Sequence, residues 1–91
     1  EHIGVVRVLN NIGLNQRNLG HLDDSLATFD RAITLAQTHQ FAALIPTLLG
    51  NRGRTLMAMS RRDEAKASFE LHARGTAETH GSRARLTPGW A

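Results

Sequence analysis

Cysteine and tyrosine are absent from this chain of 91 residues, and other aromatic residues are few, with three Phe and one Trp. The absence of cysteine excludes disulfides and thiolate metal sites, and it gives no sign of an oxidising compartment. No apolar run approaches the roughly 18 residues that a membrane-spanning helix needs, and no signal peptide is recognisable. We therefore expect a cytoplasmic protein that does not enter a membrane.

Hydrophobic residues make up 41% of the chain and charged residues 21%, which is ordinary for a globular domain. The formal net charge of +3 is unevenly placed, with three Arg against four acidic residues in 1–45 and eight Lys and Arg against four acidic residues in 46–91. The basic second half either attracts an acidic partner or is a solvated helix surface. Because the sequence starts at Glu1 without a Met, we expect it to be part of a larger protein.

An internal repeat organises the sequence. The residues that recur with a spacing of forty are Leu9 and Leu49, Asn11 and Asn51, Gly13 and Gly53, Asp23 and Asp63, Ala27 and Ala67, and Phe29 and Phe69. Self-similarity at a period of tens of residues indicates stacked supersecondary units. We divide the chain into a first unit, 1–40, a second unit, 41–80, and an irregular tail or linker, 81–91, in which the helical pattern stops.

The first unit is predicted to contain two helices. Residues 2–19 form the first, with a 3.6-residue apolar period that places Val5, Val8, Leu9, Ile12 and Gln16 on one buried stripe. Gly20 ends it, because glycine adopts a left-handed conformation without strain. Asp23 and Asp24 fall in the first turn of the second helix, where carboxylates favour the positive end of the dipole. That helix ends near Thr38, and its stripe is Leu22, Leu26, Phe29, Ile33 and Ala36.

The second unit repeats this plan. Its first helix begins near Ile45, or earlier with a kink, because Pro46 belongs in a first turn and moves Ile45 away from helical geometry. Ser60 stands where Gly20 stood, and Asp63 opens the last helix. The predicted apolar sets are Leu48, Leu49, Gly53, Leu56 and Met59, and then Ala65, Phe69, Leu71 and Ala73. Glycine at 13 and 53, inside helices, predicts a neighbouring helix that approaches too closely for a side chain.

These residues resemble the tetratricopeptide repeat over about residues 3–80. The pattern is matched in the first unit by Leu9, Ile12, Gly13, Gly20, Phe29 and Ala32, and in the second by Leu49, Gly53, Ala65 and Phe69. The period of forty is similar to the longer-helix subclass of bacterial regulators and kinesin light chains. The sequence departs from the pattern at Gln16, Ser25, Arg52, Ser60 and His72. The resemblance implies an all-α fold, in which two stacked antiparallel helix–turn–helix repeats form a short right-handed α-solenoid.

The resemblance also implies a protein-interaction or scaffold module, which binds a protein or peptide on the concave face lined by the first helix of each unit. The candidate partner-binding residues are Arg7, Asn10, Asn11, Asn18, Thr47, Asn51 and Arg54. Asn11 and Asn51 resemble the residues that hold a peptide main chain, since an amide both donates and accepts hydrogen bonds. Alternatively, they solvate the face or bond between repeats. Trp90 in the tail is a candidate anchor, because Trp is frequent at interface hot spots.

Other classes of function are less favoured by the sequence. The five His residues form no His-Glu-x-x-His pair, so we expect neither a metal site nor a cofactor nor an enzyme. Nucleic-acid binding is an alternative that would use basic side chains of the second half, but no interleaved aromatics support it. Self-association is a further alternative, in which the tail joins two copies, because two repeats leave outer faces uncovered.

Overall fold

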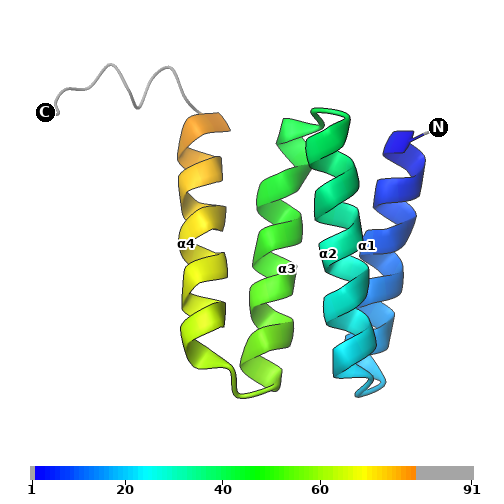
Figure 1. The fold of residues 1–91 in the computed structure, drawn as a ribbon, viewed down its shortest axis with the longest axis vertical. Helices are drawn as coiled ribbons and strands as arrows, with labels where there is room; N and C mark the ends of the chain where they lie inside the picture. Colours follow the sequence, from blue (N-terminus) through cyan, green and yellow to red (C-terminus); the bar gives the residue numbers. More distant parts are fainter. Residues whose placement is uncertain (1, 80–91) are drawn as a thin grey trace, which may run out of the picture.

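Four helices follow one another in the computed structural model, which describes residues 2–79. They are α1 (His2–Asn18), α2 (Leu22–Thr38), α3 (Ile45–Ala58) and α4 (Arg62–Thr79), with a 3₁₀ turn, η1 (Ala42–Leu44), before α3. The predicted tail, 81–91, and its Trp90 lie outside the described residues. The all-α prediction is confirmed: the helices stand side by side as two antiparallel hairpins, with α1 and α4 at the two ends of the row (Figure 1).

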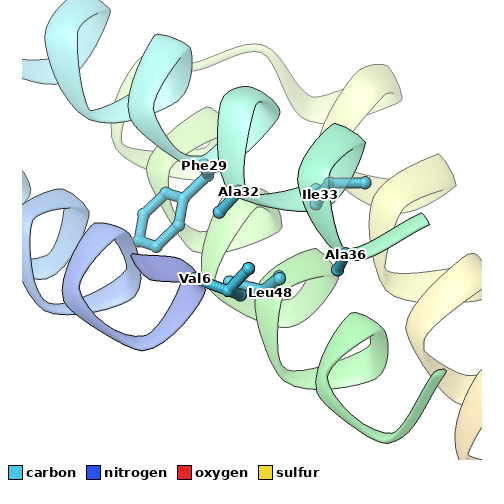
Figure 2. Close-up of a cluster of buried hydrophobic side chains, with 6 residues drawn as sticks. All are labelled: Val6, Phe29, Ala32, Ile33, Ala36 and Leu48. Carbon is cyan, nitrogen blue, oxygen red and sulfur yellow. The ribbon is translucent and has the colours of Figure 1, made fainter. Parts of the chain in front are cut away.

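The core joins the two hairpins. It contains Val6 from α1, Leu48 from α3 and, from α2 between them, Phe29, Ala32, Ile33 and Ala36, which Figure 2 shows converging on one space. Leu48 is 2% exposed and Val6 is 1% exposed. Because α2 contacts both of its neighbours, α1, α2 and α3 share this core, while Leu56 of α3 and Ala65 of α4 are also fully buried.

Glycine and phenylalanine set the spacing within each hairpin. A Cβ placed on Gly13 would lie 2.7 Å from Cζ of Phe29, and one on Gly53 would lie 2.6 Å from Cε1 of Phe69. The close approach predicted from the two glycines is therefore confirmed, and in each hairpin the contact is with the phenylalanine sixteen residues later.

The buried face of α1 differs from the prediction. Val5, Val8 and Ile12 are 49%, 55% and 41% exposed, whereas Val6 and Gly13 are buried. α2 packs on the side of this helix that contains Val6 and Gly13, where the absence of a side chain at Gly13 makes room for the ring of Phe29. The prediction that Val5, Val8 and Ile12 are buried was therefore wrong.

Two further predictions are corrected in the second hairpin. Leu71 and Ala73 of α4 are exposed, and Ser68 is buried instead, where its hydroxyl donates to the Leu49 carbonyl oxygen at 2.8 Å. Ile45 is helical, with φ −63° and ψ −44°, although proline follows it. Its N–H bonds to the Ala42 carbonyl in η1, so the chain enters α3 already wound, and Pro46 takes its predicted place in the first turn.

Candidate functional site

Charge is divided between the helices by their place in each hairpin. Neither α1 nor α3, the first helix of each hairpin, contains an acidic residue. Within residues 2–79, every Asp and Glu belongs to α2 or α4. The charged side chains of α1 and α3 are Arg7, Arg17, Arg52 and Arg54. The face built from the first helices therefore carries positive charge alone.

Asparagine and arginine side chains join α1 to α3. Nδ2 of Asn51 donates to Oδ1 of Asn10 at 2.8 Å, and Nη1 of Arg17 donates to the backbone oxygen of Asn51 at 3.1 Å. Asn51 is only 7% exposed, and its side-chain amide forms a hydrogen bond that connects the two hairpins. These bonds hold the Arg17 guanidinium beside α3, in the part of the site that contains Arg54.

A pocket of about 260 Å³ opens beside this junction, between α3 and α4. It is lined by Thr47, Gly50, Asn51, Arg54, Phe69 and His72. Gly50 keeps it open, since a Cβ there would lie 3.2 Å from Nδ1 of His72. The His72 ring itself is positioned by its contact through Nδ1 with the Pro46 carbonyl oxygen. Three of the predicted partner-binding residues thus share one cavity.

Two arginines lie close enough in this region to affect each other. The pKa of Arg17 is lowered, first because its guanidinium is partly buried and then because Arg54 is a like charge nearby. In the described part of the chain, ion pairs join Arg52 to Asp30 and Arg61 to Glu64, and neither Arg17 nor Arg54 takes part in one. Two cations that repel each other without a carboxylate between them form a favourable place for an anion.

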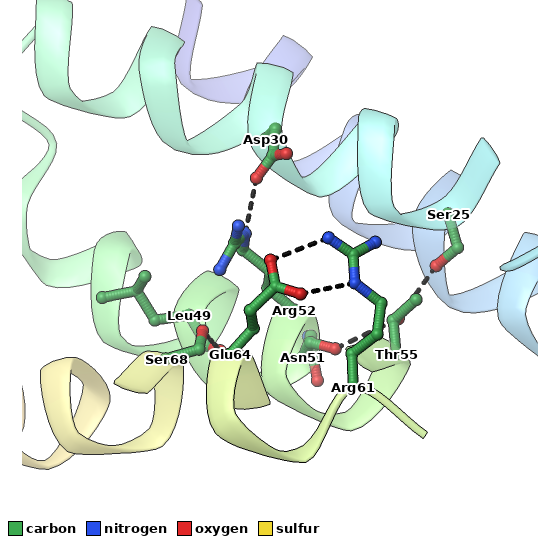
Figure 3. A network of polar contacts seen from close by, with 9 residues as sticks. All are labelled: Ser25, Asp30, Leu49, Asn51, Arg52, Thr55, Arg61, Glu64 and Ser68. Atoms are coloured by element: carbon green, nitrogen blue, oxygen red, sulfur yellow. Dashed lines mark hydrogen bonds and ion pairs between the residues drawn. The ribbon is translucent and has the colours of Figure 1, made fainter. Parts of the chain in front are cut away.

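Polar contacts join α3 to the helices on either side of it (Figure 3). The hydroxyl of Ser25 donates to the Gly13 carbonyl at 2.8 Å and lies 3.0 Å from Oγ1 of Thr55. Nε of Arg52 donates to Oδ1 of Asp30 at 2.6 Å, so Arg52 forms an ion pair that joins α3 to α2. These bonds connect α2 to α3, and the Ser68 hydroxyl connects α3 to α4.

The structure brings together only part of the predicted site. Thr47, Asn51 and Arg54 line the pocket, and Asn10 contacts Asn51. The other predicted residues on α1, namely Arg7, Asn11 and Asn18, are exposed and do not line this pocket.

Sequence reasoning missed Arg17, Phe69 and His72 as site residues. A signal for Arg17 was present, because it follows Asn10 by seven residues and so lies on the same side of the helix. No comparable signal marked His72, whose position depends on how α4 packs against Pro46.

No helix in the described part of the chain combines the length and apolar character needed to cross a membrane. Among residues 2–79, His, Asp and Glu side chains do not gather in a group of three that could hold a metal ion.

Residues 6–39, which span α1 and α2 almost completely, match the family model of the tetratricopeptide repeat. Comparison with curated proteins and with solved structures gives no match. The matched residues contain the Gly13–Phe29 contact, and the second hairpin repeats that contact forty residues later. Residues 6–39 therefore have the pattern of a tetratricopeptide repeat, and repeats of this family generally mediate protein–protein interaction or scaffolding.

Proposed function

We propose that this chain binds an acidic peptide segment of a partner protein on the face formed by α1 and α3. The observation that carries the proposal is the position of two arginines on helices that contain no acidic residue: Arg54 lines the pocket, and Arg17 bonds to Asn51, which also lines it. A carboxylate placed between the two guanidinium groups would relieve their mutual repulsion. It would also receive charge-assisted hydrogen bonds, which are stronger than neutral ones.

The neighbouring polar groups suit an extended chain. Thr47 is exposed at the pocket and offers a hydroxyl, while Asn11 is exposed on α1 and offers both a donor and an acceptor to a main chain. Asn51 acts differently in this proposal, because its amide already bonds to Asn10. It supports the face by holding α1 against α3, and it contributes little direct contact with the peptide.

The alternative of nucleic-acid binding has less support from the described residues. Of the basic side chains in the second half, Arg52 and Arg61 are paired with carboxylates. Asp63, Glu64 and Glu70 are interspersed with the cations of α4 and would oppose a phosphate backbone. We therefore retain the peptide as the proposed partner.

The wider context is also a proposal. The forty-residue repeat supports assignment to the long-repeat subclass, with units 1–40 and 41–80, and that subclass suggests a cytoplasmic regulatory protein of which this chain is one part. The acidic peptide would then be the signal or assembly partner of that regulator.

The experiment is a display selection with random acidic peptides that end in a free carboxylate, followed by affinity measurements on the enriched peptides. We expect the double variant Arg17→Gln/Arg54→Gln to bind them at least about ten-fold more weakly, since each charge-assisted bond contributes about 1.5–3 kcal/mol. The matched control is Arg52→Gln, which removes one arginine of α3 whose partner is Asp30. The control should bind like the wild type if its circular dichroism is native.

Two results would contradict this proposal. One is equal affinity of the enriched peptides for the wild type and a folded double variant. The other is a selection that enriches no peptide, because the cationic face would then not bind carboxylates.

A further inference from the structure

The pocket between α3 and α4 has a counterpart in the first hairpin that is already filled. The residues that correspond at a spacing of forty are Phe29 and Phe69, and Ala32 and His72. Phe29 and Ala32 are fully buried in one core cluster with Leu48 of α3 (Figure 2). α4 is the last helix of the described residues, and Phe69 and His72 on it are only half-buried. The first hairpin therefore shows what such a surface holds, which is the side chain of a leucine.

The polar side of the pocket has a counterpart as well. Asn10 corresponds to Gly50, and its Oδ1 accepts a hydrogen bond at 2.8 Å from Nδ2 of Asn51 on α3. In the second hairpin the residue at this position has no side chain, and the space beside it belongs to the pocket of about 260 Å³. The second hairpin thus presents an open recess where the first hairpin contacts α3.

A whole helix fits this surface less well than a single side chain does. On α2, Leu26 is half-buried and Ile33 is 9% exposed in the core shared with α3. The corresponding residues of α4 are Lys66 and Ala73, and both are exposed. A helix packed along α4 would remove the charge of Lys66 from water and would gain only one methyl group at Ala73. One apolar side chain that enters the pocket avoids the first cost and does not need the second contact.

We infer that this pocket binds a leucine-sized apolar side chain (Leu, Ile or Met) of the acidic peptide, beside the carboxylate that Arg54 receives. The inference rests on the proposed function, and it makes the two peptide residues neighbours because Arg54 lines the same pocket. Arg54 is exposed, and exposed ion pairs contribute little free energy of binding alone. An apolar side chain against the ring of Phe69 supplies the anchor that the charges lack. The recognised motif is therefore an acidic residue next to Leu, Ile or Met, and not a run of acidic residues.

Gly50 and His72 set the size of the side chain that the pocket accepts. A methyl group on Gly50 would lie 3.2 Å from Nδ1 of His72, so Gly50→Ala narrows the pocket. His72→Ala has the opposite effect, because it gives the second hairpin the small residue that the first has at Ala32. The two variants should therefore change the preferred side chain in opposite directions.

A peptide series tests this inference. In an acidic peptide from the display selection, the apolar residue is replaced in turn by Ala, Leu and Phe, and each Kd is measured by fluorescence anisotropy. The wild type should bind the leucine peptide at least about ten-fold more tightly than the alanine peptide, because it buries more apolar surface. Gly50→Ala should reduce this ratio at least about three-fold, and His72→Ala should raise the affinity for the phenylalanine peptide relative to the leucine peptide.

The matched control for the added methyl group is Gly4→Ala on α1, where no atom lies within 4 Å of the new Cβ. Its ratio of leucine to alanine affinity should equal that of the wild type. Circular dichroism establishes that each variant is folded, and His72→Ala keeps the test decisive if Gly50→Ala fails to fold.

A change of the acidic peptide residue to its amide separates this inference from the proposed function. Equal affinities for the leucine and alanine peptides, together with a loss of binding for the amide, would overturn the inference and leave the proposed function standing. A leucine preference without any loss for the amide would contradict the proposed function and leave the pocket assignment standing.

Three further results would overturn the inference. One is a selection whose acidic peptides carry no recurrent Leu, Ile or Met beside the acidic residue. Another is the same order of peptide affinities in the wild type, Gly50→Ala and His72→Ala. The third is a set of NMR shifts that extends along α4 to Lys66 and Ala73, since this pattern would indicate a docked helix instead of one inserted side chain.

Discussion

At the scale of single residues, the contact between Gly13 and Phe29 sets the distance between α1 and α2. The ring of Phe29 is fully buried, and a methyl group at residue 13 would lie within 2.9 Å of three of its carbon atoms. The same contact recurs at Gly53 and Phe69, but Phe69 is only half-buried and can shift more easily. The glycines therefore permit close packing at the cost of lower helix propensity.

Replacement of Gly13 by alanine should destabilise the protein. Overpacking costs about 1–3 kcal/mol, which exceeds the gain of about 1 kcal/mol from higher helix propensity. The matched control is Gly4→Ala in the same helix, where no atom lies within 4 Å of the new methyl group. Thermal unfolding should show a lower Tm for Gly13→Ala and an unchanged or higher Tm for Gly4→Ala. Equal shifts in both variants would mean that the ring contact does not limit the approach of the helices.

Ser25 is a second residue with an unexpected structural role. It occupies a position where the family pattern has alanine, and its buried hydroxyl bonds to the Gly13 carbonyl and lies beside the Thr55 hydroxyl. Ser25→Ala should cost about 1–2 kcal/mol in the free energy of unfolding, because a buried hydrogen bond is lost. Thr34→Ala, which removes an exposed hydroxyl from the same helix, is the control for urea denaturation. An unchanged midpoint of urea unfolding for Ser25→Ala would show that the Ser25 hydroxyl does not stabilise the contact between α1, α2 and α3.

At the scale of elements, the three turns between helices share one design with a spacing of twenty residues. Gly20, Gln40 and Ser60 have φ of 84°, 60° and 63°. After each of them the next N–H bonds to the carbonyl five residues earlier: His21 to Gln16, Phe41 to Ala36 and Arg61 to Leu56. This is the Schellman arrangement that ends helices with a left-handed residue.

Two of these left-handed positions lack glycine, and glycine there should stabilise the protein. Left-handed backbone costs a residue with a Cβ about 1 kcal/mol or more. We expect Ser60→Gly and Gln40→Gly each to gain up to about 1 kcal/mol in the free energy of unfolding. The reverse change, Gly20→Ala, should lose a similar amount. A destabilised Ser60→Gly, measured by urea unfolding, would contradict the assignment of that turn.

The start of α4 carries an exposed ion pair with a measurable pH dependence. Arg61 donates from Nε and Nη2 to the two oxygens of Glu64 at 2.6 and 2.7 Å. This hydrogen bonding, and then the positive charge, lowers the pKa of Glu64 below its ordinary value. The pair therefore favours the folded state above the pKa of Glu64 in the unfolded chain. That contribution disappears as the pH falls through the lowered, folded value.

Arg61→Gln should raise the pKa of the Glu64 carboxyl, as followed by its carbon chemical shift in an NMR titration. Arg62→Gln removes a neighbouring exposed arginine and should leave that pKa nearly unchanged, because the ion pair of Glu64 is with Arg61. The same pKa in wild type and Arg61→Gln would show that the pair does not persist in solution.

The positions of the elements were largely predictable from the sequence, and their buried faces less so. Gly20, Asp23 and Pro46 mark helix ends through backbone chemistry that acts locally. The buried face of α1 was misassigned because Val5, Val8 and Ile12 have the correct period but no helix against them. The left-handed φ of Gln40 could not be predicted from its residue type. The only indication is that Gln40 follows Gly20 by twenty residues.

At the scale of the whole molecule, charge separates the two kinds of helix. Acidic residues in the described chain lie on α2 and α4, while the charged residues of α1 and α3 are all arginine. The sequence predicted Thr47, Asn51 and Arg54 as neighbours because one helix places them on successive turns. It could not predict that Arg17 would reach Asn51, since that contact depends on how the two hairpins stack. The cationic junction between α1 and α3 therefore forms only when the two hairpins stack on each other.

The most direct test of the central claim is an NMR titration of the isotope-labelled protein with a peptide from the acidic display selection. The account predicts that the largest shifts fall on Thr47, Gly50, Arg54 and the side-chain N–H of Arg17, and that they disappear in Arg17→Gln/Arg54→Gln. The largest shifts on α2, on α4 away from the pocket, or on Val5, Val8 and Ile12 of α1 would contradict it and would place binding away from the α1–α3 junction.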